Sequence, residues 1–367
     1  MDRLVLIDGH AILHRAYHAY PRLTTRKGEL INAVYGFSSI LLSVLRLLHP
    51  EYVACAFDIP KPTFRHQEFK GYKAHRPKVD EDLIKQIPKA KGVVKTLNIP
   101  IFEKEGFEAD DVIGTIAKSA FGKTNFSSVS KLALTVSTAV HGNQDKNQSK
   151  SNRQGCRRLA QTSANTQKNC PAKRALEVII VTGDKDVLQL IDNQVKVFIP
   201  QRGKQPASMV DRKAFLEKYG FEPKRLVDFK ALAGDASDAI PGVKGVGPKT
   251  TTNLIVKFGN LRGIYDNLDK IEDKIRVKLR QGKKRALLSY RLAKIVTDVP
   301  IKFDLSKCRL LDYDRRKVIQ LFDELEFRSL IKRLPGMEKG EDKKKTRVKN
   351  TNSTDKSKDK QIGLFKL

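Results

Sequence analysis

Nine acidic residues of this sequence stand where strands are expected to end or helices to begin. They are Asp8, Asp58, Glu108, Asp110, Asp111, Asp184, Asp186, Asp235 and Asp238. If these carboxylates converge, they repel one another unless cations lie between them. Oxygen ligands without His or Cys suit Mg²⁺, which Mn²⁺ can replace. Two such ions about 4 Å apart can hydrolyse a phosphodiester, because one activates water and both stabilise the developing charge. The sequence therefore predicts a two-metal hydrolytic site.

Each of these acids also has a purely structural interpretation. Asp110 and Asp111 suit the N-terminus of a helix, where acids are favoured. Asp184 and Asp186 suit a turn after Gly183, and Asp58 suits a turn before a proline. Acids that follow three separate strands are harder to explain as caps and turns, so the metal site is the favoured interpretation.

A second motif spans residues 234–250, which read GDASDAIPGVKGVGPKT. Gly245 and Gly247 allow a tight hairpin between two helices, and Pro248 suits the first turn of the second helix. Exposed backbone N–H groups beside Lys249 and Thr250 make an anion site for a DNA phosphate. The alternative is a plain helical hairpin. The residues expected to contact DNA here are Gly242, Lys244, Gly245, Gly247, Lys249 and Thr250.

A third feature is a basic stretch over residues 61–78. Its cations are Lys61, Arg65, His66, Lys70, Lys73, His75, Arg76 and Lys78, with Phe64, Phe69 and Tyr72 between them. Cations interleaved with aromatic rings suit a single nucleic-acid strand, with phosphates on the cations and bases on the rings. The alternative is a solvated basic helix whose apolar side is packed.

The elements that must position these residues read as an α/β fold. Short apolar runs at residues 4–7, 52–57, 178–181 and 195–199 predict buried parallel strands, and residues 33–48 and 110–120 predict helices between them. Strands that alternate with helices favour a mostly parallel sheet covered on both faces. In such sheets the binding crevice lies beyond the carboxyl ends of the strands, which is where the acids stand.

Three regions are expected along the chain. Residues 1–210 form the catalytic domain, and within it residues 123–174, with ten basic residues and one acidic, read as a loose insertion. Residues 211–335 form a helical DNA-binding region. Residues 336–367 read as a disordered basic tail.

The net charge of the 367-residue chain is +30, and +16 remains without the insertion and the tail. This excess predicts a polyanionic partner, nucleic acid first and an anionic membrane second. No apolar run approaches the roughly 20 residues that span a bilayer, and the start is no secretory signal, so a cytoplasmic protein without membrane contact is expected.

The four cysteines form no CxxC pair, which argues against a zinc ribbon. Cys55 lies in an apolar run and is expected in the core. Cys156 and Cys170 lie near His141 in a polar stretch, where a metal knuckle or free loop thiols are the alternatives.

Together these motifs closely resemble the 5′-nuclease domain of bacterial DNA polymerase I and its stand-alone relatives. The matching stretches, in the family's order, are residues 6–9 with 15–17, 32–37, 56–58, 64–65, 72–76, 108–111, 182–186 and 234–250. The resemblance covers residues 1 to about 334, apart from the insertion.

The resemblance implies a PIN-like core, a helical arch and a helix–hairpin–helix DNA clamp. It implies that the nine acids form the two-metal site, some through water, with Asp111 also catalytic. Lys73 and Arg76 would contact the scissile phosphate, Tyr72 would stack on a base, and Arg65 would help to hold the strand. Backbone carbonyls would hold a potassium ion at the hairpin, from Leu232, Ala233, Pro241, Val243 and Val246.

The implied activity is structure-specific 5′–3′ exonuclease and flap endonuclease cleavage of DNA with 5′ flaps, nicks or ends, by a monomer, serving RNA-primer removal and repair. A PIN-type ribonuclease acting on structured RNA and an inactive branched-DNA-binding protein are the rival hypotheses. The hairpin favours DNA over RNA, and the complete acid set favours an enzyme.

Three departures from the family pattern stand out. No polymerase or proofreading domain follows, which predicts a stand-alone nuclease or a fragment. The insertion separates Glu108 from Asp184 more than is usual and should loop out. Ala239 stands where the family usually has Asn, and a small effect is expected there.

The last residues resemble the short peptide with which bacterial replication proteins dock on the sliding clamp. Its anchors would be Gln361, Ile362, Leu364 and Phe365, on a basic tail that acts as a tether. The alternatives are chance and a last turn that packs on the domain.

Overall fold

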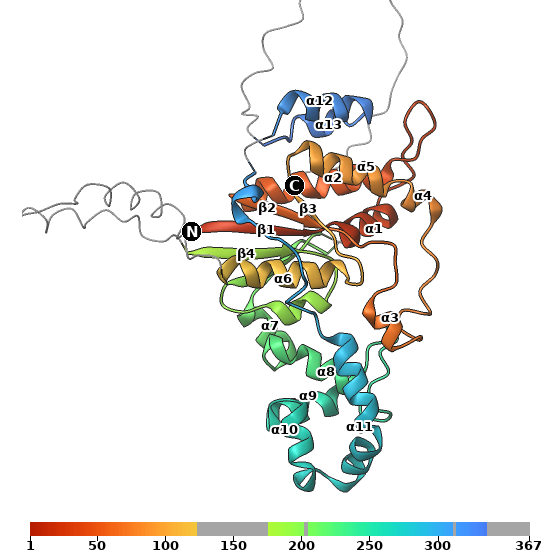
Figure 1. Cartoon of the computed structure of the whole chain (residues 1–367), viewed down its shortest axis with the longest axis vertical. Helices are drawn as coiled ribbons and strands as arrows, with labels where there is room; N and C mark the ends of the chain where they lie inside the picture. The colour runs from red at the N-terminus through yellow and green to blue at the C-terminus, as the bar shows by residue number, and fades with distance from the viewer. Residues whose placement is uncertain (123–174, 202–204, 311–312, 336–367) are drawn as a thin grey trace, which may run out of the picture.

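The computed structural model describes residues 1–122, 175–201, 205–310 and 313–335. The insertion with Cys156, Cys170 and His141, and the tail with the clamp-docking peptide, therefore lie outside the described residues. The molecule is elongated, with an α/β part above and a helical part below in the view of Figure 1.

A six-stranded sheet forms the centre of the α/β part, in the order β3-β2-β1-β4-β5-β6. The first five strands are parallel and β6 pairs antiparallel with β5. The strands are β1 Asp2–Asp8, β2 Tyr52–Ala56, β3 Ile101–Phe102, β4 Leu176–Val181, β5 Val195–Ile199 and β6 Ser208–Val210. The mostly parallel sheet expected from the sequence is confirmed, while β3 and β6 are too short to show as apolar runs.

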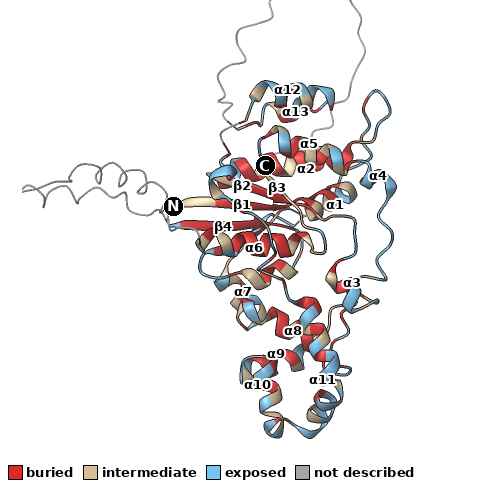
Figure 2. Cartoon of the chain, viewed as in Figure 1, coloured by how far each residue is buried: buried red, intermediate tan, exposed pale blue. Residues whose placement is uncertain are grey.

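Both faces of the sheet are buried (Figure 2), and alternate residues of each strand point to opposite faces. Val5 and Ile7 of β1 belong to one core cluster, and Leu4 and Leu6 belong to another. The first face is covered by α1 (Gly9–Ala19), α2 (Asn32–Leu48) and α5 (Ile87–Thr96), and the second by α6 (Ala109–Gly122). Two-sided burial explains why these strands read as continuous apolar runs.

The chain between β2 and α5 carries the basic stretch of residues 61–78. It contains two short helices, α3 (Phe64–Glu68) and α4 (Glu81–Ile84), and otherwise turns and extended backbone. The expected helical arch is therefore mostly an irregular strap, since Gly71 and Pro77 interrupt helix formation. Figure 1 shows this strap on the outside of the molecule, between α1 and the helical part.

The helical part follows β6. It comprises α7 Arg212–Tyr219, α8 Leu226–Ala233, α9 Pro248–Phe258, α10 Leu261–Asp266 and α11 Asp273–Ala293, with short 3-10 turns at Pro223–Arg225 and Leu268–Lys270. Two further 3-10 turns lie outside it, at Asp186–Leu190 between β4 and β5 and at Leu305–Cys308 after α11. The helices have local start and stop signals. Asp211 and Asn260 cap α7 and α10, and Gly220 ends α7 with a φ of 76°.

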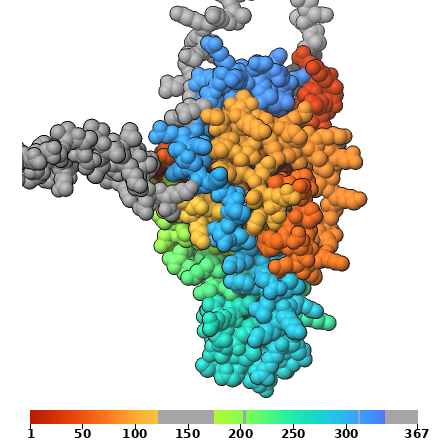
Figure 3. Space-filling view, viewed as in Figure 1, coloured from red at the N-terminus to blue at the C-terminus, as the bar shows by residue number. Residues whose placement is uncertain are grey.

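After α11 the chain returns to the sheet, whereas residues 211–335 were expected to form one helical region. Ile295, Val299 and Phe303 pack in the core cluster that includes α6. The following helices α12 (Arg315–Glu324) and α13 (Arg328–Ile331) pack with α2 and α5. Figure 3 shows this return segment on the surface, running from the helical part up to α12 and α13. Within the part of the chain that the structure describes, no helix is long and apolar enough to cross a bilayer.

Candidate active site

The site lies where the strand order changes direction. From β1 the chain proceeds to β2 and β3 on one side, whereas β4 lies on the other side of β1. A crevice forms at such a point because the loops at the carboxyl ends diverge. A cavity of about 1360 Å³ occupies this position, bounded by the strand ends, α1, the strap and the loop after α8.

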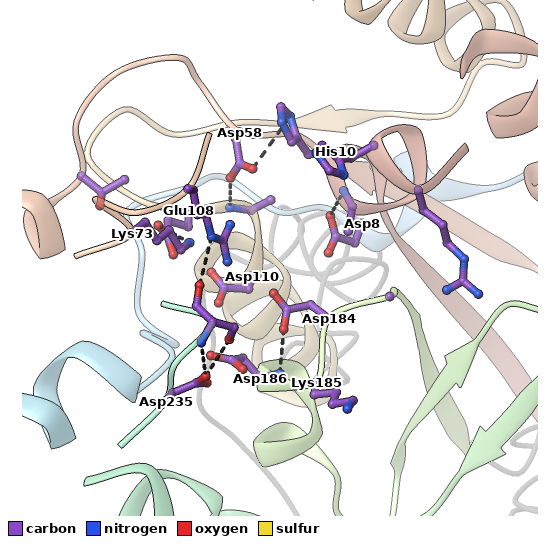
Figure 4. Close-up of a pocket in the computed structure, with 18 of the residues that line it drawn as sticks. Asp8, His10, Asp58, Lys73, Glu108, Asp110, Asp184, Lys185, Asp186 and Asp235 are labelled. Atoms are coloured by element: carbon purple, nitrogen blue, oxygen red, sulfur yellow. Dashed lines mark hydrogen bonds and ion pairs between the residues drawn. The ribbon is translucent and has the colours of Figure 1, made fainter. Parts of the chain in front are cut away.

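Seven of the nine predicted acids line this cavity, from five separate chain segments (Figure 4). They are Asp8, Asp58, Glu108, Asp110, Asp184, Asp186 and Asp235. The prediction that acids distant in sequence gather in one bowl is therefore confirmed for these seven, and Asp111 and Asp238 do not line the cavity.

Asp8 ends β1 and caps α1. Its carboxylate accepts a hydrogen bond from the Ala11 N–H at 3.0 Å and another from the Thr182 hydroxyl at 2.7 Å. Burial, with a smaller contribution from Asp58 and Asp184, raises the pKa of Asp8 to about 7. Asp58 follows β2, where Oδ1 accepts from the Ala109 N–H at 2.7 Å and Oδ2 lies 3.8 Å from His10 Nδ1.

The tight turn after β4 presents Asp184 and Asp186. The Thr182 hydroxyl accepts from the Asp184 N–H at 2.9 Å, and Asp184 Oδ1 accepts from the Asp186 N–H at 2.8 Å. These bonds fix the turn and leave carboxylate oxygens facing the cavity. Burial and the nearby Asp184 raise the pKa of Asp186 to about 7, although Lys230 opposes this shift.

Glu108 and Asp110 lie at the start of α6. Lys73 of the strap donates to Glu108 Oε1 at 2.8 Å. Burial and then the neighbouring Asp111 and Glu108 raise the pKa of Asp110 well above its ordinary value. A carboxylate in this position is stabilised by cations, which is the property that a metal site needs.

Asp235 belongs to the loop after α8 and bonds to Lys230 of that helix, with Lys230 Nζ 2.5 Å from Asp235 Oδ2. Lys230 also bonds to Asp186. Burial alone would raise the pKa of Asp235, but Lys230 and Ser237 lower it overall. Sequence reasoning missed Lys230, since no motif distinguishes it from an ordinary helix-surface lysine.

Asp111, predicted as a metal ligand and a catalytic group, does not line the cavity in this structure. Its side chain is completely buried, and Arg65 donates to both of its oxygens at 2.7 and 2.8 Å. It also accepts from the backbone N–H groups of Glu108 and Val296. With its oxygens occupied in this way, Asp111 joins α6 to the strap and to the return segment.

Arg65, predicted to help hold a DNA strand, is only 1% exposed in the structure. Beyond Asp111, it donates to the carbonyls of Leu292 and Lys294 at 2.9 Å each. The spacing of Arg65 and Asp111 in the sequence gave no sign that they pair. The pair is a buried structural pin at the base of the strap.

Tyr72, predicted to stack on a base, is 3% exposed in the structure. Its hydroxyl lies 3.1 Å from Glu108 and 3.3 Å from Asp238. Asp238 also bonds to Arg76, which explains why it faces the strap rather than the cavity. Lys73 and Arg76 do line the cavity, from the strap, as expected for groups that meet a phosphate.

The hairpin connects α8 to α9 as predicted, with Pro248 in the first turn of α9 and Gly245 at a φ of 78°. Lys244, Gly245, Gly247 and Lys249 are exposed and Thr250 is half-buried. The remaining hairpin residue predicted to contact DNA, Gly242, is placed differently. It is buried, its N–H donates to Ser289 at 3.0 Å, and a Cβ there would lie 2.4 Å from the Gly234 nitrogen.

The cationic face of α11 was also missed by sequence reasoning. Its exposed cations are Lys274, Lys278, Arg280, Lys283, Lys284, Arg285 and Arg291. Lys278 donates to the Gly245 carbonyl at 3.1 Å, so the solvent side of α11 adjoins the hairpin at this residue. The many lysines and arginines of this helix could have indicated a cationic surface. The sequence did not show that the helix lies beside the hairpin.

The donor set of the cavity fits hard divalent cations, because it consists of carboxylate oxygens from several segments, and burial raises the pKa of Asp8, Asp110 and Asp186. Among the described residues no three His, Cys, Asp or Glu side chains are already gathered around one ion-sized point. Lys73 and Lys230 instead hold Glu108, Asp186 and Asp235. Ion binding would therefore need rotation of these side chains.

Comparison with known proteins gives two family matches, to the two domains of one family. Residues 3–131 match the N-terminal resolvase-like domain of 5′-3′ exonucleases, and residues 221–316 match their C-terminal SAM fold. DNA polymerase I of Caldicellulosiruptor bescii is 37% identical over 334 residues, and that of Bacillus subtilis is 34% identical over 333 residues. Each alignment covers 90% of this chain, and the chain spans about a third of the length of these relatives.

The fold has counterparts among solved structures. The D15 protein of bacteriophage T5, co-crystallised with metal ions, aligns with a TM-score of 0.57 and 17% identity, over 89% of this chain and 98% of D15. A complex of the T5 D15 flap endonuclease with DNA and metal ions aligns with a TM-score of 0.56 and 18% identity, over 88% and 99%. At this identity the likeness shows the fold alone. The paired family matches, the polymerase relatives and the acidic bowl together show that the chain belongs to the 5′-3′ exonuclease family.

Proposed function

We propose that this protein is a divalent-metal-dependent nuclease that hydrolyses DNA phosphodiesters near 5′ ends, nicks and 5′ flaps. The observation that carries the proposal is the cavity in which seven carboxylates from five chain segments face two cations of the strap. The chemistry expected of two bound Mg²⁺ or Mn²⁺ ions is activation of water and neutralisation of the phosphate. Products would carry a 5′-phosphate and a 3′-hydroxyl.

The residues of this chain have distinct roles in this proposal. Asp8, Asp58, Glu108, Asp110, Asp184, Asp186 and Asp235 would hold the ions. Lys73, 21% exposed, and Arg76, 48% exposed, would orient the scissile phosphate from the side of the strap. Since Lys73 and Arg76 now bind Glu108 and Asp238, an incoming phosphate would compete for them.

Duplex DNA is proposed to lie on the helical part. The exposed hairpin residues offer phosphate contacts beside the N-terminus of α9, and α11 extends the cationic surface. This surface supports DNA rather than structured RNA as substrate, and the acid set supports an enzyme rather than an inactive binding protein. The D15 flap endonuclease of phage T5, which shares the fold, has been crystallised with DNA and metal ions, in line with this assignment.

Three finer features remain part of the proposal. A potassium ion would bind the carbonyls of Leu232, Ala233, Pro241, Val243 and Val246. The Leu232 and Val243 carbonyls already accept backbone bonds within the hairpin, and each retains a second lone pair. The protein would act as a monomer, and its tail would dock on the sliding clamp.

A 5′-labelled DNA flap, a matched RNA hairpin and an EDTA control test the activity. We expect cutting of the flap near its junction, dependent on Mg²⁺ and absent in EDTA. Asp184→Ala should reduce the rate by about a thousandfold or more, because the metal contribution is several kcal/mol, while DNA affinity stays close to wild type. Lys73→Ala should lower the rate more than the affinity.

Glu177→Gln is the matched control, because it neutralises a carboxylate at the opposite end of β4 and should cut like the wild type. Cutting of the RNA hairpin in preference to the flap would replace the proposal with the ribonuclease. Undiminished cutting in EDTA would remove the metal mechanism.

A further inference from the structure

Lys230 holds an unusual position for a lysine. It lies on α8 in the helical part, but its side chain is only 9% exposed and its ammonium group reaches the acidic cavity. There it bonds to Asp186 from the turn after β4 and to Asp235 from the loop after α8. Figure 4 shows Asp186 and Asp235 close together on the side of the bowl away from Asp58.

The other cations near the acids are placed differently. Lys73 and Arg76 belong to the strap, keep more exposed side chains and are turned towards Glu108 and Asp238. They face the space from which a phosphate would approach. Lys230 comes from α8 rather than from the strap, and it pairs with two acids that both line the cavity. Its geometry is that of a cation shared between ligands.

We infer that the Lys230 ammonium is a resident counter-ion that occupies a divalent-cation position of the bowl, so that lysine and metal compete for Asp186 and Asp235. This inference rests on the proposed metal-dependent function. In the metal-free protein Lys230 keeps two desolvated carboxylates compensated and joins the sheet to the helical part. When an ion takes the same oxygens, the flexible four-carbon stem lets the ammonium withdraw.

The competition has two opposite consequences for a neutral variant. Lys230→Met keeps most of the apolar stem but leaves Asp186 and Asp235 without their cation. The metal-free protein loses stability, because buried charges are left unpaired. The same variant binds divalent ions more tightly, because no ammonium has to be displaced from the ligands.

The experiment measures the thermal midpoint of wild type and Lys230→Met in EDTA and in Mn²⁺, together with Mn²⁺ affinity by calorimetry. In EDTA the variant should unfold roughly 5 °C below wild type, and in saturating Mn²⁺ the gap should close. Its Mn²⁺ dissociation constant should be about tenfold lower, or it should bind one more ion. Both readouts are independent of nuclease activity.

Lys196→Met is the matched control, because Lys196 pairs with Glu177 at 2.7 Å at the far end of the sheet. The thermal midpoint of Lys196→Met should lie below that of wild type by the same small amount in EDTA and in Mn²⁺. An equal loss for Lys230→Met in both conditions, with unchanged Mn²⁺ affinity, would make Lys230 a structural ion pair and overturn the inference. If wild type itself gains no stability from Mn²⁺, the proposed metal dependence fails instead.

Discussion

The two ends of the central sheet treat their carboxylates in opposite ways. At the amino end, Glu177 of β4 bonds to Arg3 at 2.9 Å and to Lys196 at 2.7 Å. Burial would raise its pKa, but these two cations lower it overall. At the carboxyl end, burial raises the pKa of Asp8 and Asp186 to about 7. Glu177 alone is paired with two cations, whereas the seven carboxylates of the cavity share only a few cations between them.

This difference shows how to distinguish a structural acid from a functional one. An acid that is fully compensated by its own protein stabilises the fold and has no need of an external ion. Acids that outnumber the neighbouring cations repel one another. Such repulsion is typical of sites that bind cations or substrates. Position at the carboxyl end alone is insufficient, since Asp111 lies there and is fully paired with Arg65.

The largest effect on stability is expected for Asp111→Ala. Removing this carboxylate leaves the Arg65 guanidinium buried without its partner, which costs about 3–5 kcal/mol of unfolding free energy. Chemical denaturation measures the loss. The double variant Arg65→Met/Asp111→Leu should recover most of it, because both charges are then absent. A stable Asp111→Ala protein that has lost only metal binding would return Asp111 to the ligand set.

A smaller effect, dependent on pH, is expected for Glu177→Gln at the amino end. At neutral pH the variant should be less stable by about 1 kcal/mol, since the partners Arg3 and Lys196 are partly exposed. The folded-state pKa of Glu177 lies below its ordinary 4.5, so the stabilisation is fully present above that pH. It is lost as the pH falls further, through the folded-state pKa.

Denaturation curves of wild type and Glu177→Gln between pH 3 and pH 7 would show this convergence. A stability gap that stays constant down to the lowest pH would mean that packing, rather than charge, holds Glu177 in place.

The smallest effect is expected for Ala239→Asn in the loop beside Asp238. Ala239 has a φ of 57°, in the left-handed region that Asn tolerates better than Ala. The substitution should stabilise the protein by roughly 0.5 kcal/mol and leave the acids in place. A thermal midpoint that falls would show that the added amide meets a neighbour, and Ala239→Val, which is β-branched, should lower it in any case.

Much of the fold and of the site could be predicted from the sequence. The buried strands are long enough to show as apolar runs, and Asp8, Asp58 and Asp184 follow them directly. Because parallel strands bring their carboxyl ends to one edge, those acids had to converge. The strand β3, with two residues, and the antiparallel β6 gave too little pattern to detect.

What the sequence could not supply was pairing between side chains. Arg65 and Tyr72 look like nucleic-acid contacts in a basic, aromatic stretch. Only the tertiary packing of the strap, against α6 and the end of α11 for Arg65 and against α8 and α11 for Tyr72, buries them. Asp110 and Asp111 are neighbours of the same type, yet helix geometry turns one to the cavity and the other to Arg65. Lys230 reaches the acids for a similar reason, through the approach of α8 to the turn after β4.

The chain leaves the sheet after β6 and comes back to it after α11, so two covalent passages rather than one attach the helical part to the α/β part. The Arg65–Asp111 pin and the carbonyls of Leu292 and Lys294 fasten the second passage to the base of the strap. A doubly anchored platform resists swivelling. On the proposed function, this double attachment would fix the number of nucleotides between the bound duplex and the position of cleavage.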